Sequence, residues 1–487
     1  MGAFPVRTLR ELIADLPGAE VSGDDRAEIR GLSYRSSDAR DGFVFFCVPG
    51  STRDGHDFAA EAVDAGAVAL VVERPLPGLR ATQVLVPSVR AAMGPVSAAF
   101  YGRPADAMTV VGVTGTNGKT TTTYLLEAVF RASGRTPGVL GTTGVRIDGR
   151  PAPFPRTTPE APDLHRLFAE MAESGVDAVA MEVSSHGLDQ HRVDGVRFDC
   201  AVFTNLSQDH LDYHPSMEAY FAAKARLFTS GMSERAVLNH DSEHGRRLMG
   251  CGVPVLTYGI DEGADVRATS VRTSAEGIAF AVDGTQIRSR LRGRFNVENA
   301  LAALATARSL GIPDALAAEA IKSVGEVPGR VEPVETGRGF LVTVDYAHTP
   351  DSVENVLRAM RPLATGRLIA VLGCGGDRDR GKRPDMGRAA TSNADLSILT
   401  SDNPRSEDPL AIIAEIEPGA RLGGGAYLVE PDRRAAIHLA ISEAAEGDVV
   451  VIAGKGHETY QELAGRTIPF DDREVVADAL RAIQEPA

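Results

Sequence analysis

The sequence predicts an α/β protein in which mostly parallel sheets are flanked by helices. Short apolar, β-rich runs alternate with helix-like stretches, and this alternation is typical of parallel α/β units. Each run ends in a polar or glycine-rich loop, and ligands of such folds bind beyond the carboxyl ends of the strands. A length of 487 residues allows about two to four domains of ordinary size. Functional residues are therefore expected in the loops that follow the strands.

The predicted elements follow one another in a regular order. The first legible strand is expected at 43–48, running into Gly50. Later strands are expected at 108–113, 178–183, 200–203, 340–344, 368–372 and 449–453. Helix-like stretches lie at 121–133 and 298–310, where a glycine closes each one, and a further helical run covers 219–228.

Two loops suggest domain boundaries. Tyr101-Gly102-Arg103-Pro104 precedes the strand at 108–113, and Val327-Pro328-Gly329-Arg330 separates a helical stretch from a new run of strands. We therefore expect a smaller N-terminal α/β domain over residues 1–105, a central domain over 106–330 and a Rossmann-like C-terminal domain over 331–487.

The composition excludes some classes of protein. A net charge of −15 and a pI near 5.3 argue against a general nucleic-acid binder, although a local basic pocket can still hold an anionic substrate. The four cysteines are widely spaced without a C-x-x-C pair, which fits a reducing compartment better than a zinc site or a disulfide framework. They are Cys47, Cys200, Cys251 and Cys374.

No segment suggests export or a membrane. The first residues lack a basic stretch followed by an apolar one, and Val6 stands where a myristoylation signal needs Ser or Thr. No uninterrupted apolar run approaches the roughly 18 residues of a membrane span. We therefore expect a cytoplasmic protein without a membrane or nucleic-acid partner.

A phosphate-binding loop follows the strand at 108–113. Its glycines let backbone N–H groups surround phosphate oxygens at the start of a helix. Lys119 is expected to reach the β- and γ-phosphates of ATP, and Thr120 to hold Mg²⁺. The strict P-loop pattern has glycine where this chain has Val113, so a simple glycine-rich turn is the alternative. The expected ATP contacts are Gly115, Thr116, Asn117, Gly118, Lys119, Thr120 and Thr121.

Three further residues could serve phosphoryl transfer. Glu182 ends an apolar strand, where a carboxylate is costly unless it meets a cation, and it would suit Mg²⁺. His210 follows the next strand; the alternatives are a salt-bridged strand end for Glu182 and a capping or core histidine for His210. Lys224 has apolar neighbours, so it is either a lysine with its amine at the surface or a desolvated amine able to react with carbon dioxide.

The phosphate loop resembles that of the Mur ligase and folylpolyglutamate synthetase superfamily, in which ATP phosphorylates a carboxylate and an amine then displaces phosphate. The resemblance implies that Lys119, Glu182, His210 and Lys224 are catalytic. It also implies that Thr120, Glu182, His210 and a carbamylated Lys224 hold the metal. Motifs around Asn299, Arg330 and Asp345 match the nucleotide side of the family.

Other segments resemble those Mur ligases that bind the nucleotide-linked dipeptide UDP-MurNAc-L-Ala-D-Glu. The resemblance makes the N-terminal domain the UDP-binding one. Where the family often has Asp-Ser-Arg, this chain has Ser33-Tyr34-Arg35, with Tyr34 at the serine position. The expected contacts are Leu32, Tyr34, Ser51, Thr157, Thr158, Ser184, Gln190 and Arg192.

The C-terminal third resembles the diaminopimelate-adding Mur ligases. Asp402-Asn403-Pro404-Arg405 matches their recognition motif, and a guanidinium can grip the far carboxylate that diaminopimelate has and lysine lacks. The loop at 375–383 carries four cations and suits an anionic ligand, or is a solvated charged loop. The expected contacts are Arg378, Asp402, Asn403, Pro404, Arg405, Gly454 and Glu458, the last of which could bind the far ammonium.

The resemblance thus implies a monomeric, magnesium-dependent ATP ligase of peptidoglycan synthesis, and through it a part in cell-wall biogenesis, cell shape, cell division and the cell cycle. It would join meso-2,6-diaminopimelate to the D-glutamate γ-carboxylate through an acyl phosphate. The alternatives are a lysine-adding sister ligase, a folylpolyglutamate synthetase, a non-catalytic binding protein of the same fold, and an unrelated P-loop kinase or ATPase.

Overall fold

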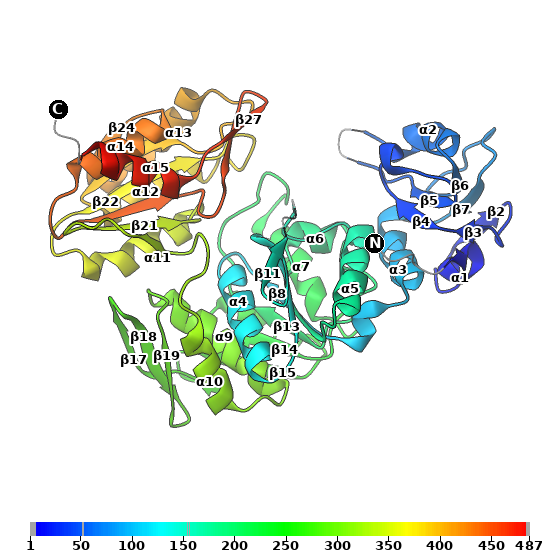
Figure 1. Ribbon diagram of the computed structural model, residues 1–487, viewed down its shortest axis with the longest axis horizontal. Coiled ribbons are helices and arrows are strands. Elements are labelled where there is room, and N and C mark those ends of the chain that lie inside the picture. Colours follow the sequence, from blue (N-terminus) through cyan, green and yellow to red (C-terminus); the bar gives the residue numbers. More distant parts are fainter. Residues whose placement is uncertain (1–5, 51–52, 153, 155, 484–487) are drawn as a thin grey trace.

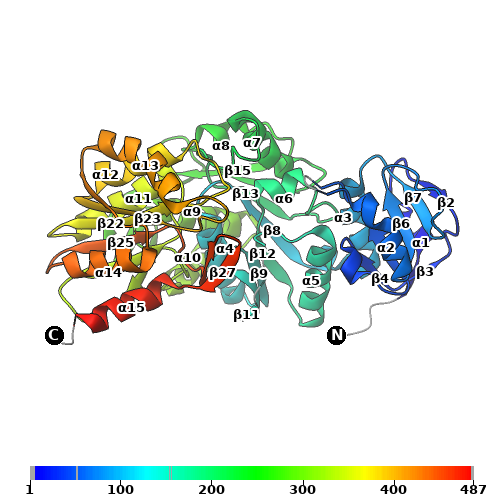
Figure 2. The same ribbon diagram turned by 90° about the horizontal axis from the view of Figure 1, so that it is seen from above.

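The structure, a computed structural model, describes residues 6–50, 53–152, 154 and 156–483. Each of three regions that follow one another along the chain contains one large sheet, and the central region lies between the other two (Figures 1 and 2). Within the described residues, no helix is long and apolar enough to cross a membrane. The predicted α/β class with mostly parallel sheets is confirmed, while boundaries near residues 105 and 331 remain a proposal.

The N-terminal region has a five-stranded sheet of order β2-β7-β6-β5-β4, in which only β2 is antiparallel to its neighbour. Helix α3 packs its apolar side, with Val89 and Val96, on the sheet residues Val44 and Val71. The strands are β1 (Arg7–Thr8), β2 (Glu20–Ser22), β3 (Glu28–Ile29), β4 (Gly31–Ser33), β5 (Phe43–Phe46), β6 (Ala67–Val72) and β7 (Thr82–Leu85). The α-helices are α1 (Leu9–Ile13), α2 (Ala59–Asp64) and α3 (Val89–Tyr101).

The central region has a nine-stranded sheet of order β11-β10-β9-β12-β8-β13-β14-β15-β16, parallel from β9 to β16. A separate three-stranded sheet has the order β17-β18-β19. The strands are β8 (Thr109–Thr114), β9 (Pro137–Gly141), β10 (Gly144–Ile147), β11 (Arg150–Ala152), β12 (Ala178–Glu182), β13 (Cys200–Phe203), β14 (Ala236–Asn239), β15 (Val255–Gly259), β16 (Val266–Arg267), β17 (Thr269–Ser274), β18 (Gly277–Val282) and β19 (Thr285–Ser289). The α-helices are α4 (Lys119–Ala132), α5 (Ala161–Glu173), α6 (Ser185–Asp189), α7 (Met217–Ala225), α8 (Glu243–Arg247), α9 (Phe295–Ser309) and α10 (Asp314–Ser323).

Helices cover both faces of the central sheet, which explains why its strands are apolar throughout. Val111 and Val113 of β8 point to one face and join the core formed with α4 and α9. Val110 points to the other face and packs in the core that includes α5. A strand buried on both faces exposes polar groups only at its ends, so the loops after β8, β12 and β13 carry the polar side chains.

The C-terminal region has a six-stranded sheet of order β20-β21-β25-β22-β23-β24, in which only β20 is antiparallel. Helices α11, α12 and α13 cover one face, and α14 and α15 the other. The strands are β20 (Glu332–Val334), β21 (Leu341–Asp345), β22 (Leu368–Cys374), β23 (Leu396–Ser401), β24 (Ala426–Val429), β25 (Val449–Ala453) and the hairpin β26 (Tyr460–Leu463) and β27 (Arg466–Pro469). The helices are α11 (Pro350–Met360), α12 (Arg383–Asn393), α13 (Pro409–Gly423), α14 (Arg433–Glu443) and α15 (Asp472–Ala482).

The predicted elements agree with the observed ones within a few residues. Two predicted strands, 200–203 and 449–453, have the bounds of β13 and β25. The helix expected at 121–133 begins earlier, at Lys119, because the end of the phosphate loop is already helical. The helical run at 219–228 is α7, which begins at Met217 and passes into a short 3₁₀ turn at Arg226–Phe228.

A fully buried ion pair between Arg433 and Asp472 connects strands β23 and β25 of the C-terminal sheet to α15. The side chains of Arg433 and Asp472 are both 0% exposed, with Nε–Oδ1 at 2.8 Å and Nη2–Oδ2 at 2.7 Å. Arg433 also donates to the carbonyls of Ser401 on β23 and Ala453 on β25. The guanidinium therefore fixes the carboxyl ends of two strands, where the site described below begins.

Arg433→Ala is expected to lower the free energy of unfolding by about 3–5 kcal/mol, because it leaves Asp472 buried without a counter-charge. Urea unfolding followed by circular dichroism measures this. Arg434→Ala is the control: Arg434 pairs with Asp478 at the surface, with side chains 51% and 42% exposed, so its loss should stay within about 1 kcal/mol. Equal effects of the two substitutions would contradict the role given to burial.

Candidate active site

The phosphate loop joins β8 to α4 at the carboxyl edge of the central sheet. A Cβ at Gly115 would lie 1.9 Å from Thr204 Oγ1, and one at Gly118 2.3 Å from Asn299 Oδ1, so both positions need glycine. The Lys119 ammonium donates to the carbonyls of Gly115 at 3.0 Å and Thr116 at 2.7 Å, folding back over its own loop. The loop is thus compact, with the ammonium of Lys119 held against its own backbone.

A cavity of about 400 Å³ opens beside this loop. It brings Asn299, Arg330 and Asp345 together with the loop, although they lie far apart in the chain. Predicted ATP contacts that line it are Asn117, Gly118, Thr120, Thr121, Asn299, Arg330 and Asp345. Tyr346, from the same motif as Asp345, lines it too. So does Asp351, which the sequence did not single out and which accepts from Asn117 Nδ2 at 2.9 Å. Residues of the phosphate loop and residues of the later nucleotide motifs therefore line the same cavity.

Arg330 connects the C-terminal region to the phosphate loop. Its Nη2 donates to Thr120 Oγ1 at 2.8 Å, and its guanidinium lies 4.9 Å from the centre of the Tyr346 ring. Asp345 is buried and accepts from the backbone N–H groups of Val331 and Ala347 at 2.7 Å each, and burial raises its pKa. Asp345 therefore fixes the turn that presents Arg330 and Tyr346 to the cavity.

Glu182 has the surroundings of a cation ligand. Its carboxylate is 1% exposed and accepts only from the N–H and hydroxyl of Thr142, both at 2.9 Å, and no ion pair to it exists within the described residues. A Cβ at Gly141 would lie 2.3 Å from Glu182 Oε1, so the backbone leaves room for the carboxylate. A buried carboxylate without a side-chain cation fits Mg²⁺, although the described residues contain no ready group of three or more His, Cys, Asp or Glu ligands.

Lys224 and His210 both lie close to the ring of Tyr220. The Lys224 ammonium is buried, donates to Gly115 O at 2.8 Å and lies 4.6 Å from the Tyr220 ring centre. Burial, and then the nearby Lys119 charge, hold the pKa of Lys224 well below its usual range. Burial also lowers the pKa of His210 to about 3. The amine of Lys224 is therefore more readily neutral than a surface lysine.

The residues predicted to hold the dipeptide gather at the end of β12 and around α6. Thr158 Oγ1 donates to Glu182 O at 3.0 Å, and Ser184 N donates to Thr158 Oγ1 at 3.0 Å. Arg192 donates to Thr158 O at 3.1 Å and to Gln190 Oε1 at 2.7 Å. Thr157 joins them through its hydroxyl, 3.2 Å from that of Thr142.

Leu32 and Tyr34 lie apart from that group. They line a cavity of about 260 Å³ between the N-terminal sheet and α5, together with Arg166. The Tyr34 hydroxyl donates to Asp163 Oδ2 at 2.6 Å, so Tyr34 links the first two regions. Ser51 lies outside the described residues.

The residues predicted to hold diaminopimelate gather where β22, β23 and β25 end. Asn403 donates to Glu458 Oε2 at 2.9 Å and accepts from the Lys455 ammonium at 3.0 Å. Lys455 also pairs with Glu458 Oε2 at 2.9 Å, so one oxygen of the carboxylate expected to bind an ammonium already has two donors. Asp402 and Gly454 are adjacent, since a Cβ at Gly454 would lie 2.4 Å from Asp402 Oδ2. Pro404 and Arg405 continue the same segment beside Gly376.

Three of the four cations in the basic loop at 375–383 have carboxylate partners within the protein, so a role of this loop in binding an anion stays a prediction. Arg380 pairs with Glu415, and Arg383 is buried against Glu407 and Glu415. Lys382 pairs with Asp209. Sequence alone does not show these carboxylates, because they come from distant segments. Arg378 has no carboxylate partner in the described chain, and its Cγ lies 3.6 Å from a Cβ placed at Gly375.

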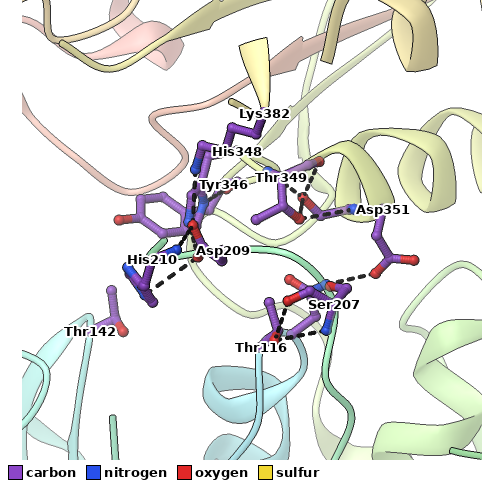
Figure 3. A network of polar contacts seen from close by, with 12 residues as sticks. Thr116, Thr142, Ser207, Asp209, His210, Tyr346, His348, Thr349, Asp351 and Lys382 are labelled. Atoms are coloured by element: carbon purple, nitrogen blue, oxygen red, sulfur yellow. Dashed lines mark hydrogen bonds and ion pairs between the residues drawn. The ribbon is translucent and has the colours of Figure 1, made fainter. Parts of the chain in front are cut away.

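A polar network centred on Asp209 joins the central and C-terminal regions (Figure 3). Asp209 Oδ1 lies 3.0 Å from Lys382 Nζ, and Oδ2 lies 3.5 Å from His348 Nε2 and 3.4 Å from His210 Nε2. Burial alone would raise the pKa of Asp209, but His348, His210 and Lys382 hold it well below its usual range. The sequence did not single out Asp209, His348 or Lys382 as partners, and the network places a buried ion pair between the two regions.

The scarcity of lysine in the sequence could have identified Lys382 and Lys455 as candidate site residues. The chain has five lysines among 51 Lys and Arg residues. Lys224, Lys382 and Lys455 are buried, Lys119 is half-buried, and Lys322 is exposed with a pair to Glu319. A chain that uses arginine for its surface cations retains lysine almost only around the site.

Comparison with known proteins gives consistent matches over almost the whole chain. Residues 28–101 match the profile of the Mur ligase family catalytic domain, 113–307 that of the Mur ligase middle domain, and 329–456 that of the Mur ligase glutamate ligase domain. A UDP-N-acetylmuramoyl-L-alanyl-D-glutamate–2,6-diaminopimelate ligase of Geobacillus thermodenitrificans is 49% identical, covering 97% of this chain and 99% of its own. A ligase of the same name from Streptomyces avermitilis is 45% identical, covering 98% and 97%.

Solved structures agree with these matches. The structure of a ligase of that same name is 34% identical and superimposes with a TM-score of 0.69, covering 99% of this chain and 100% of its own. A MurF ligase from Thermotoga maritima in complex with ADP has a TM-score of 0.65 at 20% identity, covering 93% and 97%, and this likeness concerns the fold.

Proposed function

This chain belongs to the Mur ligase family, and from that premise we propose that it is the ATP-dependent ligase that adds meso-2,6-diaminopimelate to UDP-MurNAc-L-Ala-D-Glu. The amide would form at the γ-carboxylate of D-glutamate, in the synthesis of the peptidoglycan precursor. We propose a monomeric enzyme that acts in the cytoplasm.

One observation carries the choice of amino acid. The segment Asp402-Asn403-Pro404-Arg405 lies beside Gly454 and Glu458, at the carboxyl ends of β23 and β25. It offers a guanidinium and a carboxylate to one ligand, and the far end of diaminopimelate carries both a carboxylate and an ammonium. Lysine has only the ammonium, so it would leave Arg405 without its anion. Full-length relatives that are named for diaminopimelate support the same choice.

The proposed reaction has two steps. An oxygen of the D-glutamate γ-carboxylate attacks the γ-phosphorus of ATP; the bond to the bridging oxygen breaks and ADP leaves. The amine of diaminopimelate then attacks the acyl carbon, the tetrahedral intermediate expels phosphate, and the nitrogen loses a proton. Lys119 and Arg330 face the phosphate site and would neutralise the charge that moves there. Gly115, Thr116 and Gly118 would surround the phosphates with backbone N–H groups.

A metal fits these residues. Mg²⁺ would supply charge neutralisation for phosphoryl transfer, and Glu182 and Thr120 offer hard oxygen ligands for it. Thr120 Oγ1 accepts from Arg330, so Arg330 would turn toward phosphate when Thr120 binds a cation. Lys224 suits a carbamate because its amine is buried and its pKa is low, and with His210 it would hold a second ion.

The test is phosphate release by the purified chain with ATP, Mg²⁺, bicarbonate and UDP-MurNAc-L-Ala-D-Glu. Parallel reactions contain meso-diaminopimelate, L-lysine or no amine, and mass spectrometry identifies the amide. Turnover with diaminopimelate alone is the expected result. Turnover with lysine instead would assign a lysine-adding ligase, and phosphate release without an amine would indicate an ATPase.

Arg405→Ala is expected to raise KM for diaminopimelate by about a hundredfold, because a charged hydrogen-bonded pair contributes roughly 1.5–3 kcal/mol. KM for ATP should not change. Steady-state kinetics with each substrate varied in turn measures this. Arg421→Ala is the control, since Arg421 is exposed on α13 and pairs with Glu417. A similar rise in KM for all three substrates would argue that Arg405 holds the fold rather than the amino acid.

A further inference from the structure

The hairpin β26–β27 holds the segment that contains Arg405. Arg405 N donates to Glu462 O at 3.0 Å, and Ala464 N donates to Arg405 O at 2.8 Å, so the backbone of Arg405 pairs with β26 like a short strand. Gln461 Nε2 donates to Asp402 O at 2.7 Å, and Glu462 N donates to Asn403 Oδ1 at 3.0 Å. Consecutive residues of β26 thus contact three of the four residues in this segment.

Glu462 also holds the side chain of Arg405. Its Oε2 lies 2.7 Å from Arg405 Nε, while Arg405 Nη1 donates to Gly376 O at 2.8 Å. No partner of Nη2 is present in the described part of the chain. Nη1 also donates to Asn403 O at 3.4 Å. The guanidinium is therefore held on two sides, and Nη2 is left for a ligand.

The backbone of Arg405 supports the same conclusion. Its φ is +52°, in the left-handed region that a residue with a side chain adopts at a cost of about 1 kcal/mol. Contacts with β26 offset that cost. The backbone conformation sets the direction of the Cα–Cβ bond, and Glu462 holds Nε at the other end of the side chain. The direction of the guanidinium is therefore fixed before any ligand binds.

We propose that Glu462 is a positioning residue that sets the specificity of the site for amino acids with a carboxylate at their far end. It acts through Arg405 and does not itself contact the reacting atoms. The inference rests on the proposed function, which supplies diaminopimelate as the ligand. An arginine held in one direction loses less side-chain entropy when it grips a carboxylate, and lysine gains nothing from that arrangement.

The test compares Glu462→Gln, Glu462→Asp and the wild type. Glu462→Gln keeps the shape of the side chain and removes its charge, and it is expected to raise KM for diaminopimelate about tenfold. The kcat and the KM values for ATP and the nucleotide substrate should stay within about twofold. Preference for diaminopimelate over L-lysine, taken as the inhibition constant of L-lysine divided by KM for diaminopimelate, should fall by the same factor as KM rises. Glu462→Asp should restore most of the affinity because it keeps the charge.

Glu443→Gln is the matched control. Glu443 ends α14 and pairs with Arg367 at 3.5 Å, with side chains 45% and 42% exposed. It precedes β25, whereas the site follows that strand. Removing its charge should leave every kinetic constant unchanged.

The outcomes separate the inference from the proposed function. A wild type that uses diaminopimelate, with an unchanged or lower KM in Glu462→Gln, would overturn the inference alone. A parallel fall in kcat, all affinities and the melting temperature would also overturn it, because Glu462 would then hold the hairpin rather than direct Arg405. A wild type inactive with diaminopimelate would overturn the proposed function, and the inference with it.

Discussion

Replacing Lys119 by alanine is expected to lower kcat by about a thousandfold, because phosphoryl transfer depends on cations placed against the phosphates. Lys119 lies in the phosphate loop, and burial lowers its pKa while the charge of Glu182 opposes that shift. Its loss would remove the cation closest to the backbone that surrounds the phosphates. Single-turnover measurement of ADP formation would assign the loss to phosphoryl transfer rather than product release.

Lys322→Ala is the control for this experiment. Lys322 is exposed on α10, and its surface pair with Glu319 lies at 3.1 Å. The kcat of Lys322→Ala should match that of the wild type. The melting temperature of Lys119→Ala should also stay close to that of the wild type, because the ammonium donates only to carbonyls of its own loop. Retention of more than about a tenth of the wild-type kcat by Lys119→Ala would contradict its assignment as the phosphate-binding cation.

Asp209→Asn is expected to lower kcat by about a hundredfold, equivalent to about 2.7 kcal/mol. The substitution keeps the shape of the side chain but leaves Lys382, only 8% exposed, without its counter-charge. An unpaired buried charge costs about 3–5 kcal/mol. Movement of the C-terminal region away from the central one would expose the Lys382 ammonium to water and remove that cost. The predicted diaminopimelate contacts belong to the C-terminal region, so they would move away from the phosphate loop. Small-angle scattering should then show a larger radius of gyration.

Two variants sharpen this test. Asp212→Asn changes an exposed carboxylate in the same loop and should leave activity unchanged. The double variant Asp209→Asn with Lys382→Met removes both charges, so it should recover part of the loss in a double-mutant cycle. If the single and double variants lost activity equally, Asp209 would act on the reaction directly and not through Lys382.

Much of the site could be predicted because its residues follow apolar strands. The strands end at β8, β12 and β13, and the polar loops after them meet at one edge of the sheet. This rule found Lys119, Glu182 and His210 from the residues alone. The roles of Asn299 and Arg330 needed the family resemblance, because a helix-face asparagine and a loop arginine have no pattern of their own.

The contacts between regions could not be predicted. The sequence around Asp209 predicts a loop, and nothing in its neighbours reveals that Lys382, far along the chain, faces it. The same holds for Tyr34, whose hydroxyl contacts Asp163. Such pairs depend on how whole sheets are placed against one another. Local sequence records the chemistry of each partner but not their separation.

The scarcity of accessible amines has a practical consequence. With Lys224, Lys382 and Lys455 buried and Lys119 inside the phosphate loop, amine-reactive reagents would find Lys322 as the one exposed lysine in the described chain. Lys322 is on α10, beside the small sheet β17–β19 and away from the hairpin that holds Arg405 (Figure 1). A fluorophore coupled to Lys322 would leave both substrate sides open. Binding of each substrate could then be followed on protein labelled at Lys322 without introducing a cysteine.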